Sequence, residues 1–317
     1  MPKKQPKRAP LWLRFVSGTF YAFLCAFALL AGTAASWVGG HSVGILPILF
    51  PKEPVKLFKT HQFTILMLGC DEDRAPGGAV ITSDKARSDM MLIAQLDFDK
   101  KSITGLSIPR DTGLRFPGGP LHKINAYHAY GGADLSKKAV EQLLPGVSID
   151  RVVTVNFEGF VDMVNAVGGV PIDVEKNMDY DDKAGALHIH LKKGPQMMDG
   201  ETAEGYVRFR HSDSDFVRAD RQHVFMLAFK AAAQKNLSAF PYMMDGLVKM
   251  LKDGLTSDEV VSLGYFVREV PKANMKFGSL PVHDRPGSTV LAVNEDEIPR
   301  VLREYNLIEN DHRAGER

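Results

Sequence analysis

The hydrophobic pattern divides the chain into one long apolar segment near its start and a longer body in which short apolar runs alternate with helical patterns. Residues 15–50 contain no Asp, Glu, Lys or Arg, and residues 15–38 form a run of 24 mostly apolar positions. A helix needs about 20 such residues to span a bilayer. We therefore expect a transmembrane anchor at 15–38, followed by a juxtamembrane linker over 39–60.

The charges beside this segment predict its orientation. Five basic residues and no acidic one precede it: Lys3, Lys4, Lys7, Arg8 and Arg14. Lys and Arg are enriched on the cytoplasmic side of membrane helices, so we expect residues 1–14 in the cytoplasm and the body outside the cell. Small residues at 31–36 leave a cleaved signal peptide as the alternative. The apolar run exceeds the roughly 7 to 15 residues of such peptides, which favours an uncleaved anchor.

The body of the chain alternates predicted strands and helices. The continuous apolar run 63–69 predicts a buried strand, and the runs 90–96 and 102–108, joined by a polar turn, predict a hairpin. Further strands are expected at 151–157, 170–174, 187–191 and 276–282. Helices are expected at 121–144, 158–167, 199–208, 214–233, 242–251, 257–270 and 295–305. The pattern indicates one α/β domain over 61–308, with a polar, frayed tail at 309–317.

Overall charge and cysteine content limit the possible functions. The net charge is +1, and apart from the five N-terminal basic residues, 38 acidic residues outnumber the remaining 34 of the 39 basic ones. Such a balance excludes a broad nucleic-acid-binding surface. Cys25 lies in the apolar segment and Cys70 at a predicted strand end, so no internal disulfide is expected. We interpret Cys70 as a packed thiol.

Charged residues mark three predicted strand ends. Asp71 follows the first strand, Arg87 and Asp89 flank the start of the second, and Arg110 and Asp111 follow the third. In an antiparallel hairpin, the start of one strand and the end of the next share an edge of the sheet. We therefore expect these carboxylates and guanidinium groups to meet at a ligand site.

A second charged stretch, residues 208–222, has the composition of an anion-binding segment. Its four arginines alternate with three aspartates: Arg208, Arg210, Asp213, Asp215, Arg218, Asp220 and Arg221. Guanidinium groups bind phosphate through paired hydrogen bonds. If a helix begins near Ser214, Asp215, Arg218 and Gln222 share one of its faces, and its N-terminus also favours an anion. The alternative is a solvated surface of internal salt bridges.

His188 and His190 alternate along the predicted strand 187–191. A His-x-His pair can bind a metal ion, but the sequence places no third ligand nearby. Surface positions on a strand are the favoured interpretation.

Several separate motifs occur in a characteristic order over about residues 63–235. They are Arg87-Ser88-Asp89, Ser107-Ile108-Pro109-Arg110-Asp111, Lys123-Ile124-Asn125-Ala126, Gly168-Gly169-Val170, Arg208-x-Arg210 and Arg218-Ala219-Asp220-Arg221-Gln222. This order resembles the LytR-CpsA-Psr family. The resemblance implies an α/β/α sandwich with a central mixed sheet. It also implies an extracytoplasmic Mg²⁺-dependent phosphotransferase that moves a glycopolymer from a polyprenyl pyrophosphate carrier onto peptidoglycan.

The resemblance also implies roles for individual residues. Asp71 and Asp89 match magnesium-binding carboxylates, although the acidic stretch Asp71-Glu72-Asp73 departs from the family pattern. The candidate pyrophosphate-binding residues are Arg87, Arg110, Lys123, Arg208, Arg210, Arg218 and Gln222, together with Arg221, which lies inside the matched stretch.

The expected reaction is in-line attack of a peptidoglycan hydroxyl on the glycan-side phosphorus, with polyprenyl phosphate as the leaving group. Arginines and a hard cation would stabilise the developing charge. Asp89, Asp111 and Arg110 are the candidate catalytic residues, and either aspartate is a candidate base. The apolar stretch 224–229 belongs either to an ordinary core or to a slot for the lipid. A pyrophosphate hydrolase, and a membrane-tethered regulator or lipid-binding scaffold, are the alternative functions.

Overall fold

The computed structural model describes residues 47–48, 50–70, 73–74, 80–81, 86–155, 157–182, 187–209, 215–251 and 254–308. The predicted anchor at 15–38, the predicted tails and the candidate residues Asp71 and Arg210 lie outside this part. Among the helices described, none combines the length and the apolar character that crossing a membrane requires.

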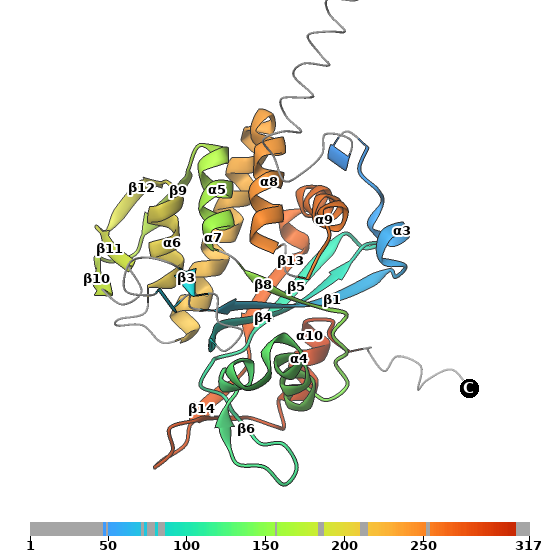
Figure 1. Cartoon of the computed structure of the whole chain (residues 1–317), viewed down its shortest axis with the longest axis vertical. Coiled ribbons are helices and arrows are strands. Elements are labelled where there is room, and N and C mark those ends of the chain that lie inside the picture. Colours follow the sequence, from blue (N-terminus) through green and yellow to red (C-terminus); the bar gives the residue numbers. More distant parts are fainter. Residues whose placement is uncertain are drawn as a thin grey trace, which may run out of the picture.

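Strands and helices follow one another along the described chain (Figure 1). The strands are β1 (Gln62–Cys70), β2 (Asp73–Arg74), β3 (Val80–Ile81), β4 (Ser88–Asp97), β5 (Ser102–Ser107), β6 (Gly113–Leu114), β7 (His122–Lys123), β8 (Arg151–Val155), β9 (Val170–Val174), β10 (Met178–Asp182), β11 (Leu187–Leu191), β12 (Gly194–Met198), β13 (Met275–Ser279), β14 (Val282–Asp284) and β15 (Leu291–Val293). The helices are α3 (Pro54–Phe58), α4 (Ala126–Leu143), α5 (Phe157–Val167), α6 (Gly200–Arg208), α7 (Asp215–Lys235), α8 (Phe240–Leu251), α9 (Ser257–Glu269) and α10 (Ile298–Glu304), with 3-10 turns at Leu237–Ala239 and Lys272–Asn274.

A mixed five-stranded sheet in the order β13-β5-β4-β1-β8 forms the centre of the fold. The predicted hairpin is confirmed, because β4 pairs antiparallel with β5, and on its other side with β1. The outer strands β8 and β13 run parallel to their neighbours β1 and β5. Since side chains alternate between the faces of a strand, the continuous apolar run of β1 serves two cores. Phe63 and Ile65 face one, and Leu66 and Leu68 face the other.

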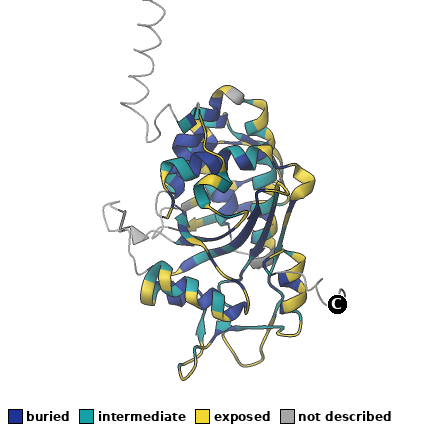
Figure 2. Cartoon of the chain, turned by 90° about the vertical axis from the view of Figure 1, so that its right-hand side faces the viewer, coloured by how far each residue is buried: buried dark blue, intermediate teal, exposed yellow. Residues whose placement is uncertain are grey.

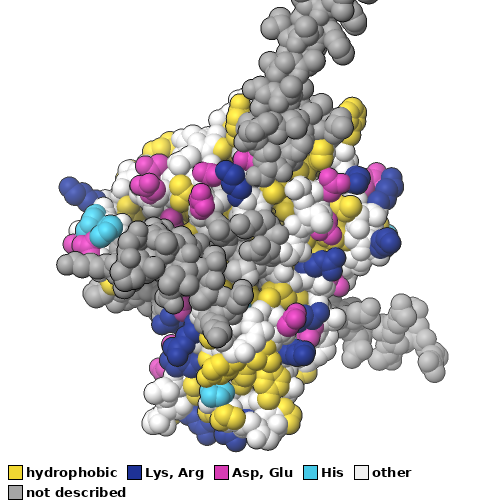
Figure 3. Space-filling model, in the orientation of Figure 1, with side chains coloured by type: hydrophobic (Ala, Val, Ile, Leu, Met, Phe, Trp, Pro, Cys, Tyr) yellow, Lys and Arg dark blue, Asp and Glu magenta, His cyan; other side chains and the backbone are white. Residues whose placement is uncertain are grey.

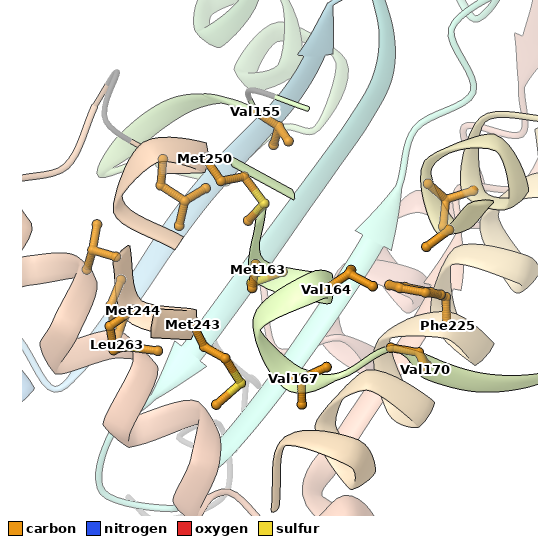
Figure 4. Packing of buried hydrophobic residues seen from close by; sticks show 14 of the residues in the cluster. Val155, Met163, Val164, Val167, Val170, Phe225, Met243, Met244, Met250 and Leu263 are labelled. Atoms are coloured by element: carbon orange, nitrogen blue, oxygen red, sulfur yellow. The ribbon is translucent and has the colours of Figure 1, made fainter. Parts of the chain in front are cut away.

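Helices cover both faces of this sheet, which confirms the expected three layers. Helices α5, α8 and α9 lie over one face, and α4 and α10 over the other (Figure 1). The strands between these layers are largely buried (Figure 2). In the first layer α5 and α8 lie unusually close. Glycine at position 159 permits this approach, because a Cβ there would lie only 2.3 Å from the backbone nitrogen of Met250. Met163, Met243, Met244 and Met250 belong to the buried apolar cluster of this layer (Figure 4).

The structure differs from the sequence-based expectation in polar segments. Strands β10 and β12 were not predicted, because one is rich in aspartate and the other contains Pro195, and both compositions disfavour strands. Each forms by pairing with a predicted neighbour, β11 or β9. The helical region expected from 121 begins at Ala126, because His122 and Lys123 pair with the loop strand β6 instead.

Candidate functional site

Three motif segments meet at one edge of the central sheet. The backbone nitrogen of Ser88 donates to the carbonyl of Asn125 at 3.4 Å, and the nitrogen of Asn125 donates to the carbonyl of Arg110 at 3.3 Å. The start of β4 is thereby joined to the segments that follow β5 and β7. The prediction that Asp89, Arg110 and Asp111 share an edge is confirmed.

The side chains at this edge form a chain of alternating charges. Arg110 Nη1 donates to Asp89 Oδ1 at 2.5 Å, and Lys123 Nζ lies 2.9 Å from Asp111 Oδ1. Arg110 Nε, 3.8 Å from the same Asp111 oxygen, links the two pairs. All four side chains are between 23% and 35% exposed, so water reaches the cluster without surrounding it.

Helices α6 and α7 contribute two further guanidinium groups, of which Arg218 on α7 contacts the cluster directly. Asp199 caps α6 by accepting from the backbone nitrogen of Thr202, and Arg208 lies in the last turn of this helix. Arg208 Nη1 donates to Glu204 Oε1 at 2.6 Å, and its guanidinium carbon lies 4.7 Å from the centre of the Phe157 ring. From α7, Arg218 Nη2 donates to the backbone carbonyl of Asp89 at 2.8 Å, and Arg218 is only 7% exposed.

A cavity of about 500 Å³ opens beside these charges. Among its polar lining residues are Asp89, Arg208, Arg218 and Gln222, so the predicted common face of Arg218 and Gln222 is confirmed. The rest of the lining is mainly apolar and includes Met67, Met90, Leu92, Val155, Phe157, Phe160, Met163, Phe225, Met226, Phe229, Met250 and Phe277. Its volume lies within the usual range of ligand sites, roughly 300 to 1,000 Å³. The cavity suits a ligand with an anionic end and a long apolar part.

Not every candidate residue reaches this cavity. Arg221 is only 2% exposed, and it donates from Nε to Glu175 Oε1 at 3.0 Å and from Nη1 to the carbonyl of Phe209 at 2.9 Å. Its guanidinium group lies 5.5 Å from the ring centres of Tyr206 and Phe209. We therefore assign Arg221 to the packing of α7 against α6. Arg87 is exposed and does not line the cavity, and Asp71, Arg210 and the side chain of Asp215 lie outside the described part of the chain.

His223 lines the cavity and was missed in the sequence, where it looks like one more position of an apolar helix. Its Nε2 is buried and has no hydrogen-bond partner among the described residues, and its ring centre lies 5.0 Å from that of Phe277. Burial lowers the pKa of His223 below its usual value; Lys272 adds to this effect, and Asp220 opposes it. The imidazole is therefore neutral at pH 7 and offers a polar contact to a ligand.

Two further buried polar atoms lie in the motif segments themselves. Ser88 Oγ and Asn125 Oδ1 find no hydrogen-bond partner within the described residues, although Ser88 is 0% and Asn125 3% exposed. Buried polar atoms normally have a partner. Both residues lie beside the segments of Asp89 and Arg110, where a bound ligand or ion would supply such a partner. Cys70 is a half-buried thiol whose Sγ lies 3.6 Å from the His128 ring, as the packed-thiol interpretation requires.

Comparison with known proteins agrees with this geometry. The model of the LytR_cpsA_psr family matches residues 51–306. The polyisoprenyl-teichoic acid–peptidoglycan teichoic acid transferase TagT of Bacillus subtilis is 29% identical over 327 residues, which cover 98% of this chain and 97% of the relative.

Solved structures extend the likeness to three dimensions. The crystal structure of B. subtilis TagV superimposes with a TM-score of 0.61 at 29% identity, over 78% of this chain and 98% of that one. The structure of TagT with bound octaprenyl pyrophosphate lipid gives a TM-score of 0.57 at 27% identity, over 82% and 94% of the two chains. With its matched motifs, mixed sheet and arginine-lined cavity, the chain belongs to the LytR_cpsA_psr family.

Proposed function

We propose that this protein transfers a glycopolymer from a polyprenyl pyrophosphate carrier to a hydroxyl group of peptidoglycan. The observation that carries the proposal is the apolar cavity with Asp89, Arg208 and Arg218 in its lining. The relative TagT is named as a teichoic acid transferase acting from a polyisoprenyl carrier to peptidoglycan, and a TagT structure holds octaprenyl pyrophosphate. These names support the same substrate class here.

The cavity matches the two chemical parts of such a carrier. An isoprenoid tail gains about 0.8 kcal/mol for each methylene removed from water, and the methionine and phenylalanine side chains of β1, β4, α5 and α7 provide the apolar surface. The pyrophosphate would bind where Arg218 meets the Arg110–Asp89 pair, with Arg208 in the lining of the same cavity. Guanidinium groups satisfy several phosphate oxygens at once and stay protonated.

A magnesium ion is part of the proposal, with Asp89 and Asp71 as its protein ligands. Magnesium typically takes one or two carboxylates, and it obtains its other oxygens from water and substrate phosphates. The described residues fit this need, because the Asp89 carboxylate is a hard oxygen donor in the cavity lining, 23% exposed. A bound ion there would neutralise phosphate charge.

In the proposed reaction, the oxygen of a peptidoglycan hydroxyl forms a bond to the glycan-side phosphorus, and the bond from that phosphorus to the bridging oxygen breaks. The products are a glycan–peptidoglycan phosphodiester and polyprenyl monophosphate. Arg110, Arg208 and Arg218 bind the oxygens on which negative charge is held, and such preorganised donors are the main source of acceleration in phosphoryl transfer.

The hydroxyl proton passes to Asp111 or Asp89. Asp111 Oδ1 is 2.9 Å from Lys123, and Asp89 Oδ1 is 2.5 Å from Arg110, so both carboxylates are held in position beside the proposed pyrophosphate site. Separate measurement of transfer and of Mg²⁺ affinity in Asp89→Asn and Asp111→Asn distinguishes them. Lost transfer with normal Mg²⁺ affinity identifies the base.

The proposed location is the outer face of the cell membrane, with residues 15–38 as the anchor and residues 1–14 in the cytoplasm. The apolar run and its basic flank support this topology. An anchored catalytic domain would meet a membrane-bound carrier and the wall at the same place.

Reconstitution with the full-length protein tests the proposal. Polyprenyl-pyrophosphate-linked glycan is incubated with or without peptidoglycan, in Mg²⁺ or in chelator, and lipid and wall products are analysed. We expect polyprenyl monophosphate to appear together with wall-linked glycan, and both to depend on Mg²⁺. Arg110→Ala is expected to abolish transfer, whereas Arg285→Ala, at an exposed arginine away from the cavity, retains it.

The alternative functions give different products. Equal release of polyprenyl monophosphate with and without peptidoglycan would identify a hydrolase. Binding of the carrier with no turnover under any condition would identify a scaffold or regulator.

A further inference from the structure

The outer face of the β10–β11 hairpin carries four side chains that can bind a metal ion. In the antiparallel register Asp179 lies opposite His190, and Asp181 lies opposite His188. Directly opposed residues share a face, and residues two apart along a strand point the same way. The two histidines and two aspartates therefore form a square on one side of the hairpin. Histidine and acidic side chains gather at the corresponding edge of the surface in Figure 3.

The distances within this group fit a carboxylate–histidine–metal arrangement. His190 Nδ1 lies 2.6 Å from Asp179 Oδ1, which leaves Nε2 as the ring atom that points to Asp181, 3.5 Å from its Oδ1. His188 Nδ1 lies 2.5 Å from the same Asp181 oxygen. Single ligand atoms of Asp181, His188 and His190 all lie within 4.8 Å of one another. Two ligand atoms of a tetrahedral zinc site with bonds of about 2.1 Å are about 3.4 Å apart.

The opposite face of the hairpin has a different environment. Tyr180, between the two aspartates, lines the large cavity, and Ile189, between the two histidines, is 2% exposed. The four outer side chains are between 51% and 83% exposed. An ion can therefore reach the outer face from solvent without disturbing the core.

We propose that this face binds a transition-metal cation, Zn²⁺ foremost, through Asp181, His188 and His190, with Asp179 holding the His190 ring. Carboxylates that accept from the second nitrogen of a metal-bound histidine recur in zinc sites and set the orientation of the ring. Water completes the coordination. The Asp181–His188 hydrogen bond is replaced by two bonds to the ion.

The donor set selects the class of metal. Two imidazole nitrogens and one carboxylate oxygen suit Zn²⁺ and its neighbours in the transition series, whereas Mg²⁺ prefers an all-oxygen shell and retains its water. The site is thus chemically distinct from the proposed magnesium site at Asp89. It does not depend on the proposed transfer reaction.

A bound ion would cross-link the two strands of a hairpin whose inner face forms part of the cavity wall. Zinc joins β10 through Asp181 to β11 through His188 and His190, and Tyr180 lies next to Asp181 in the same strand. The consequence is a more firmly held wall beside the substrate cavity.

The test is a metal titration of the full-length protein, purified through a tag that contains no histidine and freed of metal. Zn²⁺ is titrated calorimetrically at pH 7.5 in the presence of excess Mg²⁺. His188→Asn, His190→Asn and the double variant are compared with His61→Asn. His61 is the matched control, because it is an exposed histidine whose Nδ1 lies 3.0 Å from Asp99 Oδ1 and which belongs to no group of three metal-binding side chains among the described residues.

We expect one Zn²⁺ per chain in the wild type and in His61→Asn. Each single variant of the pair is expected to bind at least about tenfold more weakly, since loss of an outer-shell partner alone costs about 10- to 100-fold. The double variant is expected to lose the site, and Asp179→Asn to weaken it. Cobalt gives a second measurement, because tetrahedral Co²⁺ absorbs visible light; the band is expected in the wild type and absent in the double variant.

The variants lie on an exposed face, and circular dichroism verifies that they fold. Zn²⁺ binding that is unchanged in the folded double variant would overturn the proposal, and so would the absence of binding to the wild type.

Discussion

Arg218 of α7 donates a hydrogen bond of 2.8 Å to the backbone carbonyl of Asp89, a residue 129 positions earlier at the start of β4. The carboxylate of the same aspartate accepts from Arg110 at 2.5 Å. Asp89 thus joins two arginines from distant parts of the sequence beside an apolar cavity. This contact fixes where the charge of a ligand would lie relative to its apolar part.

Replacement of Arg218 is expected to reduce transfer strongly. Arg218→Ala removes a donor that faces the proposed pyrophosphate, and loss of one such donor costs about 10²- to 10³-fold in turnover. Arg218→Lys keeps the charge but lacks the planar fork, so we expect only partial recovery. Initial rates of polyprenyl monophosphate release measure the effect. Activity of Arg218→Ala within a factor of two of wild type would remove this residue from the mechanism.

Filling the cavity is expected to affect long carriers selectively. Met226 lines the cavity, whereas Val224, two positions earlier in α7, is 51% exposed and does not line it. Met226→Trp should raise KM about tenfold for a long polyprenyl carrier, because the larger side chain occupies space that the tail would fill. This change corresponds to the lost burial of roughly two methylenes of the tail, at about 0.8 kcal/mol each. A short-chain carrier should be affected less.

Val224→Trp is the matched control for the added ring and is expected to behave as the wild type. The two variants are compared by KM with carriers of different prenyl length. Equal effects on long and short carriers would place the tail elsewhere.

Arg221 is expected to contribute to stability rather than to transfer. Its buried side chain donates to the buried Phe209 carbonyl and to Glu175, whose side chain is 43% exposed. Arg221→Ala leaves the buried Phe209 carbonyl without its donor, which costs about 1 to 3 kcal/mol in the free energy of unfolding. Denaturant titration measures the loss, and the turnover of the folded fraction is expected to stay near wild type. Unchanged stability with lost turnover would instead assign Arg221 to substrate binding.

The low pKa of His223 predicts an acid-dependent loss of stability. Burial lowers its folded pKa below the ordinary value of 6.5. The unfolded chain then binds the proton more readily than the folded one. The stabilising contribution of neutral His223 is therefore present above about pH 6.5 and is lost as pH falls through the folded pKa.

Denaturant titrations between pH 7.5 and pH 5 test this prediction. His223→Gln should lose less stability over that interval than the wild type. His283→Gln, at an exposed histidine, should follow the wild type. Parallel curves for wild type and His223→Gln would show that the imidazole is not shielded from protonation.

The central sheet and the meeting of the motif segments could be predicted from the sequence, because they depend on local patterns. The apolar runs of β1, β4 and β5 are long, and the turn at 97–101 is polar. These patterns predicted the β4–β5 hairpin and the position of the charged motif residues at one edge of the sheet. The parallel pairing of β8 and β13 could not be predicted, since it depends on how distant helices cross the sheet.

The arginines of α7 show where sequence analysis of the site fails. Arg218 and Arg221 are one turn apart and have the same chemistry, so a helical pattern cannot distinguish them. Only packing against Glu175 and Phe209 directs Arg221 away from the cavity.

The partners of His188 and His190 were missed for a related reason. Asp179 and Asp181 lie in a strand that its own composition disfavours and that forms through pairing with β11.

The most direct test of the central claim is equilibrium binding of octaprenyl pyrophosphate to the full-length protein in Mg²⁺. The claim is that Arg110 and Arg218 bind the charged end of the carrier while the cavity holds its tail. Arg110→Ala and Arg218→Ala are predicted to bind the lipid at least about tenfold more weakly. A loss of this size corresponds to roughly one charge-assisted hydrogen bond. Arg285→Ala is predicted to bind as the wild type. Equal affinity in all four proteins would contradict the account.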